Sequence, residues 1–333
     1  MCVTVGIPRA LAYYDYYSLW EVFFSSLGIK PVISPPTNQA ILNEGVRRAV
    51  DGTCLPVKIF YGHVQWLIEA GVDHLFLPRI VSVAPREYIC PKFMGLPDMM
   101  TAVFRAGPRA WCPTIDLNRS VEYVYGQIEE LGRTLGYSSR DTHLALQEGL
   151  KAQSQTESYL QAGYWPTQDP QCPWEQPIKR DVDAQPGYEP FSFPDLCIGL
   201  LGHSYLIYDE FANMQIVARL RAMGAEIRTV DMLSQARLEA RAEQWPKRMF
   251  WTSGRRILGA ASEYMEVPVA GIVYITAFGC GTDSLTAELV ERTIRRQSKI
   301  PQLILNLDEH TGEAGVVTRL EAFVDMLRWR QSR

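Results

Sequence analysis

Three of the seven cysteines lie in short loops that contain glycine or proline and lead into a predicted helix. These are Cys54, Cys90 and Cys280. A thiol at a helix N-terminus is expected to have a lowered pKa, because exposed backbone amides and the helix dipole stabilise the thiolate. Thiolates bind soft metal ions and iron–sulfur clusters, so these residues are the first candidates for metal ligands.

Three thiolates are one fewer than a 4Fe–4S cluster normally takes. Such a set would leave one iron to an exchangeable ligand or a substrate, and chemistry could occur there. Zinc is an alternative, although the paired Cys-x-x-Cys spacing of structural zinc sites is absent from the sequence. Three ordinary loop thiols without any metal fit the positions about equally well.

The other four cysteines fall in different places. Cys2 and Cys197 begin predicted strands, so we expect them at the opposite edge of each sheet. Cys172 lies in a proline-rich stretch, whereas Cys112 follows a predicted strand and could be a fourth protein ligand. An odd number of cysteines in a chain of this size argues against a disulfide framework.

Predicted strands alternate with helices in both halves of the chain. They are expected at residues 3–7, 29–34, 73–78 and around Trp111, and then at 196–201, 226–230, 269–276 and 300–305. This alternation indicates parallel βαβ units. We therefore expect an α/β fold with two doubly wound, flavodoxin- or Rossmann-like parallel-sheet lobes. Such sheets bind ligands at the carboxyl ends of their strands, where the strand at 73–78 would deliver the Cys90 loop.

The length of 333 residues favours more than one domain. We expect an N-terminal α/β lobe over residues 1–115 with Cys54 and Cys90, and a C-terminal α/β lobe over 195–333 with Cys280. Between them, residues 116–194 have a helical period and then a high density of proline, which predicts a helical insert and a crossing segment.

Composition excludes several classes of protein. The chain has 33 basic and 37 acidic residues and a net charge of −4, so a nucleic-acid partner is not expected. The longest apolar stretch, near residues 267–276, contains a proline and is too short to cross a bilayer. The first residues enter a strand without an export-signal pattern, which predicts a cytoplasmic protein without a membrane partner.

Two basic residues are candidates for binding an anionic substrate. Lys92 follows Cys90 closely, and Arg9 comes after the first predicted strand at the ligand-binding edge. An ordinary surface ion pair is the structural alternative for both. Similarly, His203 and Ser204 follow the first strand of the second lobe and could donate hydrogen bonds to a ligand, although a loop histidine is more often structural.

Glu309 and His310 follow the last predicted strand. A carboxylate and an imidazole at this edge could act as acid or base near an open iron. Alternatively, the segment only starts the terminal helix at Thr311 and Gly312. The chain has no Gly-x-x-x-x-Gly-Lys-Ser/Thr loop, so ATP hydrolysis by this chain itself is not expected.

Five stretches of the sequence carry a family resemblance. They lie at residues 6–11, 53–58, 88–93, 278–283 and 308–312. Together they resemble the uncharacterised activase-associated relatives of 2-hydroxyacyl-CoA dehydratases and benzoyl-CoA reductases, over nearly the whole chain. The resemblance implies an iron–sulfur cluster held by three cysteines between two α/β domains, with Cys54, Cys90 and Cys280 as its ligands. It also implies low-potential electrons delivered by an ATP-hydrolysing activase or another donor.

These inferences lead to one expected function and two alternatives. The expected protein binds a 4Fe–4S cluster with an open iron for a small ligand or substrate, such as an acyl-CoA, in dehydratase-like lyase or reductase chemistry. The first alternative is a non-catalytic electron-transfer module, and the second is a metal-free hinge protein. Dehydratases of the resembled superfamily generally use paired subunits, whereas here there is one chain. Two copies of it could bring two clusters together in a homodimer.

Overall fold

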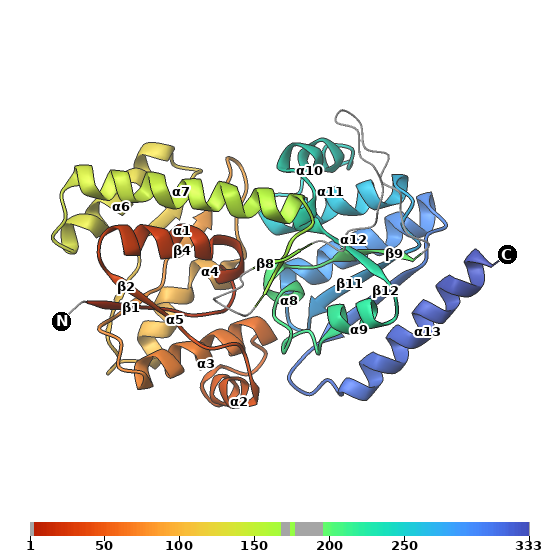
Figure 1. Cartoon of the computed structure of the whole chain (residues 1–333), viewed down its shortest axis with the longest axis horizontal. Coiled ribbons are helices and arrows are strands. Elements are labelled where there is room, and N and C mark those ends of the chain that lie inside the picture. The colour runs from red at the N-terminus through yellow and green to blue at the C-terminus, as the bar shows by residue number, and fades with distance from the viewer. Residues whose placement is uncertain (1–2, 168–173, 177–195, 333) are drawn as a thin grey trace.

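The computed structural model describes residues 3–167, 174–176 and 196–332. Most of the predicted proline-rich crossing lies outside these residues, as do Cys2 and Cys172. Within the described part, the elements gather into two lobes that lie side by side (Figure 1). The N-terminal lobe contains the first half of the chain, and the C-terminal lobe contains the second half.

The N-terminal lobe is built on a parallel sheet with the strand order β2-β1-β3-β5. Its strands are β1 (Thr4–Ile7), β2 (Lys30–Ile33), β3 (His74–Phe76) and β5 (Arg109–Trp111). A separate parallel pair consists of β4 (Arg79–Ser82) and β6 (Thr114–Asp116). The helices are α1 (Tyr13–Ser26), α2 (Gln39–Arg48), α3 (Leu55–Glu69), α4 (Pro91–Met94) and α5 (Leu96–Val103).

The C-terminal lobe repeats this plan with the strand order β10-β9-β11-β12, again parallel. Its strands are β9 (Cys197–Leu201), β10 (Glu226–Thr229), β11 (Gly271–Ala277) and β12 (Gln302–Leu307). The helices are α8 (Ser204–Ile207), α9 (Ile216–Ala222), the 3-10 helix η1 (Val230–Met232), α10 (Gln235–Ala242), α11 (Thr252–Glu266), α12 (Gly281–Gln297) and α13 (Glu313–Gln331). All seven residues of β11 are buried, as its apolar sequence predicts for a central strand.

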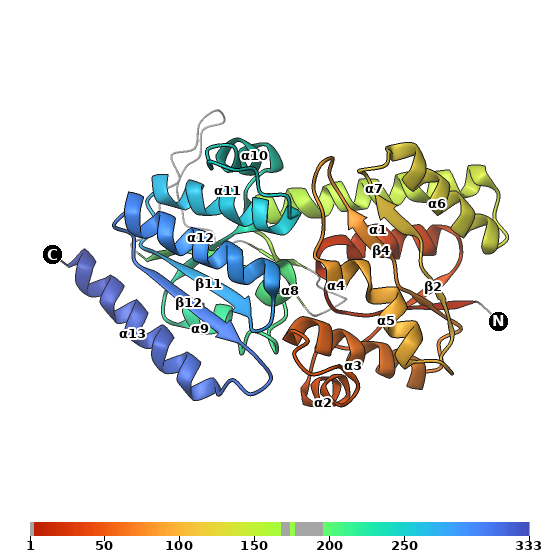
Figure 2. The same ribbon diagram turned by 180° about the vertical axis from the view of Figure 1, so that it is seen from behind.

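The predicted α/β fold class with parallel sheets is confirmed. In each sheet the strand order reverses once, between β1 and β3 and between β9 and β11. Ligands of open α/β sheets bind at such reversals, beyond the carboxyl ends of the strands. Viewed from behind, β11 and β12 point their carboxyl ends toward the N-terminal lobe (Figure 2). The fold therefore directs this edge of the C-terminal sheet to the junction between the lobes.

One predicted strand is wrong in its extent. The single strand expected at residues 73–78 ends at Phe76, and a second strand, β4, begins at Arg79. Pro78 lies between them and has no backbone N–H to continue the ladder. As a result, β4 rather than β3 leads into the Cys90 loop.

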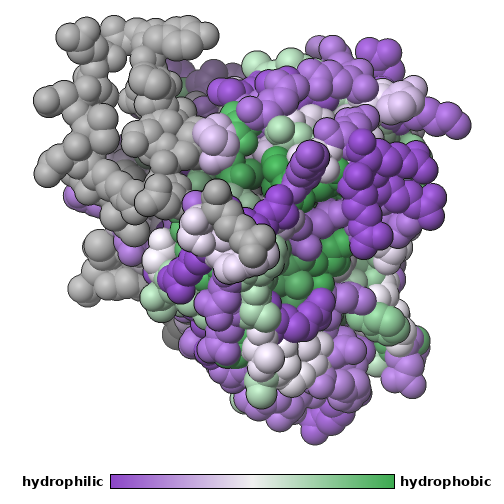
Figure 3. Space-filling view, turned by 90° about the vertical axis from the view of Figure 1, so that its right-hand side faces the viewer, coloured by the Kyte–Doolittle hydropathy of each residue, from purple (hydrophilic) through white to green (hydrophobic). Residues whose placement is uncertain are grey.

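The segment after β6 is helical, as its sequence period predicts. It forms α6 (Val121–Thr134) and α7 (Ser139–Gln161), followed by a short antiparallel pair of β7 (Trp165–Pro166) and β8 (Trp174–Glu175). Helix α7 packs along α1 and reaches η1 of the C-terminal lobe, so it bridges the two lobes (Figure 1). The face in Figure 3 is mostly hydrophilic, with hydrophobic residues visible in a central strip.

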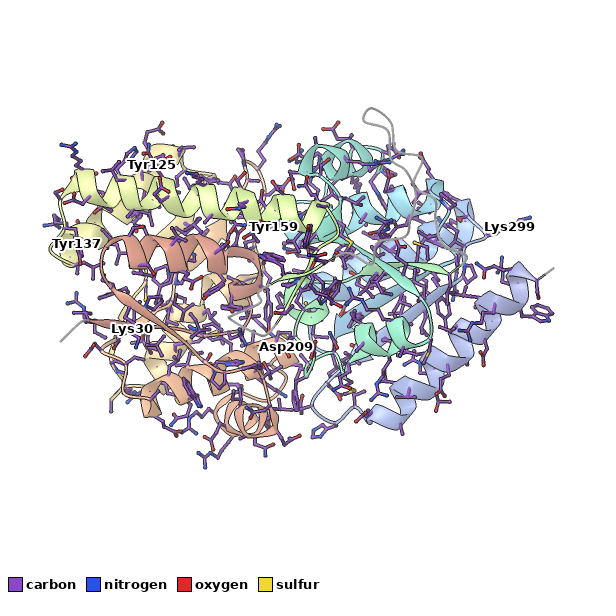
Figure 4. All side chains as sticks on the ribbon, viewed as in Figure 1. Lys30, Tyr125, Tyr137, Tyr159, Asp209 and Lys299 are labelled. Carbon is purple, nitrogen blue, oxygen red and sulfur yellow. The ribbon has the colours of Figure 1, made fainter. Side chains whose placement is uncertain are left out.

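A buried polar group also joins the lobes. Asp209 lies where they meet (Figure 4), and the Thr37 hydroxyl donates a 2.5 Å hydrogen bond to its carboxylate. The same hydroxyl lies 3.0 Å from Nε2 of His63, which is fully buried. Burial, with a smaller contribution from Arg9, lowers the pKa of His63 to about 3, so this imidazole is neutral near pH 7.

Candidate functional site

Each of the three candidate cysteines is the residue immediately before a helix. Cys54 precedes α3, Cys90 precedes α4 and Cys280 precedes α12, all with extended backbone angles. Cys54 and Cys280 are buried and Cys90 is half-buried. Proline follows Cys90 directly and Cys54 after one residue, which suits the first turn of a helix because an N–H there has no intrahelical partner.

The two lobes bring these cysteines together. Gly279 has a φ of +75°, and a Cβ atom built on it would lie 3.2 Å from the Gly52 carbonyl oxygen and 3.8 Å from the Cys54 Cα. Lys92 reaches the same place, where its Nζ lies 3.3 Å from the Gly279 carbonyl oxygen and 3.5 Å from that of Gly52. The three thiols are close enough to influence one another electrostatically.

The expected lowering of the thiol pKa values holds for only one cysteine. Burial raises the pKa of Cys54 to about 11 and also raises that of Cys90, despite the positive charge of Lys92 nearby. Burial opposes ionisation of Cys280 too, but His203 and the Thr282 hydroxyl outweigh it and lower its pKa. The sequence-based expectation overestimated how far a helix N-terminus lowers the pKa of a thiol, because desolvation has the larger effect on the pKa of a buried thiol.

A buried polar chain lies behind Cys280. Ligand atoms of His203, Cys280 and Asp283 all lie within 4.8 Å of one another, and this group could hold a metal ion. Tyr274 donates a hydrogen bond to Asp283, which lies 3.6 Å from Nε2 of His203. Although burial alone would lower the pKa of His203, the charges of Asp283, Cys280 and Asp15 raise it to about 9.

The residues just before Cys90 bind the C-terminal lobe through hydrogen bonds and ion pairs. Tyr88 forms a short parallel bridge with Trp251, in which its N–H donates to the Phe250 carbonyl and its carbonyl accepts from the Thr252 N–H. The preceding Glu87 is buried and pairs with arginines of the other lobe, Arg248 at 2.9 Å and Arg255 at 3.2 Å. These contacts hold Cys90 at the junction.

A pocket lies between the lobes and is bordered by Cys90. Its polar wall includes residues from four elements of the chain: Asp15 of α1, His203 and Ser204 at the start of α8, Asp231 of η1, and Thr252, Ser253 and Arg256 of α11. Apolar residues of the N-terminal lobe, such as Ile80 and Phe93, complete it. Burial and Asp231 raise the pKa of Asp15 to about 6, against the opposing effects of Arg256 and Ser204.

The remaining candidates lie apart from this pocket. Arg9 contacts Tyr13, to whose hydroxyl its Nε donates at 3.2 Å. Glu309 forms an ion pair with Lys58 of α3, and the side chain of His310 is 84% exposed. Neither Glu309 nor His310 borders the pocket, because β12 is the edge strand of its sheet and its loop lies away from the reversal between β9 and β11.

Cys112 is not brought to the other thiols. It follows β5, and its charged neighbours are Arg79 and Asp98, which pair with each other at 2.7 Å. Arg79 also donates to the Met94 carbonyl, so it fastens the end of α4 to the lobe. Among the described residues, the structure therefore offers no support for Cys112 as a fourth ligand.

Sequence reasoning missed much of the pocket wall. Asp15 looked like an ordinary first-turn residue of a helix, and Asp231 and Arg256 had no motif around them. A usable signal was the run from Thr252 to Gly254, in which small polar residues open a helix directly after Trp251.

The molecule is thus a two-lobed α/β protein with a thiol-bordered pocket between its parallel sheets. A family model described as the CoA enzyme activase uncharacterised domain (DUF2229) matches residues 4–233. This match covers more than half of the chain, so the chain belongs to that family and the resemblance seen in the sequence is confirmed. No curated protein matches the chain. No helix within the described residues is long and apolar enough to cross a membrane.

The matched segment contains two of the three candidate cysteines, Cys54 and Cys90. It ends just after η1, before β11 and the loop that carries Cys280. The family description ties the chain to CoA enzyme activase systems.

Proposed function

We propose that Cys54, Cys90 and Cys280 hold one 4Fe–4S cluster at the junction of the lobes, with one iron open toward the pocket. The observation that carries this proposal is the convergence of three helix-starting cysteine loops from two lobes, one of which, the Cys90 loop, also borders the pocket. As far as the described residues show, the three sulfur atoms do not gather within 4.8 Å of one another, as the ligand atoms of a single ion would.

The surrounding chain suits an anionic cluster. Lys92 places a positive charge near Cys54 and Cys90, and the amides at the starts of α3 and α12 add positive potential. Glycine at position 279 allows the backbone of one lobe to approach the Cys54 loop of the other. Each thiol must lose its proton when the cluster binds, and these groups would stabilise the resulting thiolates.

When bound, such a cluster would supply low-potential electrons and a Lewis-acidic iron. The chain's own residues would bind the substrate in the pocket and exclude water. Asp15 and His203 could carry protons there, since both border the pocket and both have pKa values moved toward neutrality or above. A pocket of this kind favours a dehydratase-like enzyme over a carrier that only passes electrons on. Its electrons would come from an external activase or another low-potential donor.

Single alanine variants of the three cysteines test the ligand assignment. Each should lose most of its iron and acid-labile sulfide after anaerobic purification. Cys197→Ala is the matched control, because Cys197 is also buried but lies at the start of β9, the opposite edge of the sheet. Equal iron in all four variants would refute the assignment.

The group of His203, Cys280 and Asp283 supports a second candidate, a site for a single metal ion. Nε2 of His203 and Oδ2 of Asp283 are buried and have no hydrogen-bond partner among the described residues. A bound ion would satisfy both atoms. This candidate predicts one metal ion per chain, no sulfide, and loss of the metal in Asp283→Asn but not in Cys54→Ala.

A further inference from the structure

Helix α11 begins at the pocket, and backbone N–H groups of its first turn have no hydrogen-bond acceptor among the described residues. Its N-cap residue is Trp251, whose side chain makes no capping hydrogen bond. The Thr252 N–H is used by the Tyr88 carbonyl, but no described residue accepts from the amides of Ser253 and Gly254. Free amides at the start of a 15-residue helix attract an anion, because the helix dipole adds to their partial charges.

The side chain of Thr252 gives a second, independent indication of a ligand. This residue borders the pocket and is only 9% exposed, and its hydroxyl oxygen has no hydrogen-bond partner within the described chain. A buried hydroxyl without a partner is unfavourable, so a ligand or a water must satisfy it.

Arg256 stands one helical turn after Thr252, on the same face of α11. One of its terminal nitrogens pairs with Asp231 at 2.7 Å, whereas its Nε is buried and has no partner among the described residues. Asp231 already balances the charge of Arg256, and Asp15 also borders the pocket. These two carboxylates would repel a phosphate dianion more strongly than a singly charged anion.

The rest of the cavity indicates the shape of the ligand. A mainly apolar pocket of the N-terminal lobe shares Ala12, Ile80 and Phe93 with this one, and it is also lined by Leu96 and Phe60. An anion held at α11 could therefore direct a short apolar tail into that second pocket.

We propose that the start of α11, with Thr252 and Arg256, is a binding site for the oxyanion of a short-chain monocarboxylate. This inference deepens the proposed function, since it names a ligand class for the pocket that Cys90 borders. The oxyanion would accept hydrogen bonds from the Ser253 and Gly254 amides, the Thr252 hydroxyl and the unpartnered Nε–H of Arg256.

Calorimetry on the anaerobically purified full chain tests this site, with butyrate as the probe and butyramide and inorganic phosphate as comparisons. Butyrate should bind at least about tenfold more tightly than either, because butyramide lacks the charge and phosphate lacks the tail. Arg256→Gln should weaken butyrate binding by about tenfold, and Thr252→Val by a smaller factor. Arg295→Gln, a change on the exposed face of α12, is the matched control and should bind butyrate as the unaltered chain does.

Absence of butyrate binding, tighter binding of phosphate, or unchanged affinity in both variants would each overturn the inference. Iron is measured on the same samples, so a failure of the cluster proposal can be told apart from a failure of the carboxylate site. Butyrate binding without iron would count against the cluster alone, and iron without butyrate binding would count against the carboxylate site alone. Circular dichroism checks that Arg256→Gln and Thr252→Val remain folded.

Discussion

Gly279 packs against the Cys54 loop across the lobe junction, with a φ of +75°, and a Cβ atom added to it would lie only 3.2 Å from the Gly52 carbonyl oxygen. Gly279→Ala should therefore strain the backbone and push the two cysteine loops apart. We expect a loss of at least about 1 kcal/mol in the free energy of unfolding, together with a lower iron content.

Gly71→Ala is the control for that variant. Gly71 has nearly the same φ, +74°, but a Cβ there would have no neighbour within 4 Å. It should lose a similar amount of stability from the backbone strain and keep its iron. Denaturant unfolding and iron analysis of both variants separate the effect of backbone strain from that of the close contact with the Cys54 loop. Equal iron contents would argue against a role for this contact in holding iron.

Lys92 is the one lysine whose side chain spans the cysteine loops of both lobes, as far as the described residues show. Lys92→Gln should lower the retention of iron and make the reduction potential of a bound cluster more negative, because a nearby positive charge stabilises the reduced, more negative state. Lys30→Gln, an exposed change on β2, should leave both quantities as they are. A potential that does not move in Lys92→Gln would contradict this role.

Glu309 should prove structural, although the sequence suggested an acid or base. Its carboxylate pairs with Lys58 across the junction, and both side chains are at least 86% buried. Glu309→Gln leaves the lysine charge without its partner and should cost about 2 to 4 kcal/mol of stability in thermal or denaturant unfolding. The double variant Lys58→Met with Glu309→Leu should recover most of that loss. A stable Glu309→Gln with impaired turnover would instead support a catalytic role.

The lowered pKa of His63 predicts how the free energy of unfolding depends on pH. Its pKa falls from 6.5 to about 3 on burial, so the unfolded chain binds a proton that the folded chain does not. Below about pH 6.5 protonation therefore stabilises the unfolded state relative to the folded one, and the free energy of unfolding should drop by up to about 1.4 kcal/mol per pH unit as the pH falls toward 3. Urea unfolding at several pH values should show a shallower slope in His63→Gln. An identical slope would mean that other groups cause the acid sensitivity.

Local patterns in the sequence were enough to predict the fold class and the cysteine loops. Strands alternate with helices along the chain, and glycine or proline beside Cys54, Cys90 and Cys280 marks loops that start helices. Such signals are predictable because the residues that decide where an element begins are neighbours in the chain.

The pocket wall depended on contacts that the sequence does not contain. The bridge between Tyr88 and Trp251 joins residues from different lobes, and it sets α11 beside the Cys90 loop. A position at the carboxyl edge of a sheet was also not enough to predict that a residue borders the pocket. His203 follows β9 at the strand-order reversal and borders the pocket, whereas His310 follows the edge strand β12 and faces solvent.

The most direct measurement is iron and acid-labile sulfide per chain on anaerobically purified protein, with electron paramagnetic resonance after reduction and again after cyanide is added. About four of each per chain, with a spectrum that shifts on addition, is the expected result for a three-cysteine cluster with one open iron. About four of each with an unchanged spectrum would mean that the fourth iron is closed. Iron and sulfide both absent from the protein would contradict the cluster and leave Cys54, Cys90 and Cys280 as ordinary thiols.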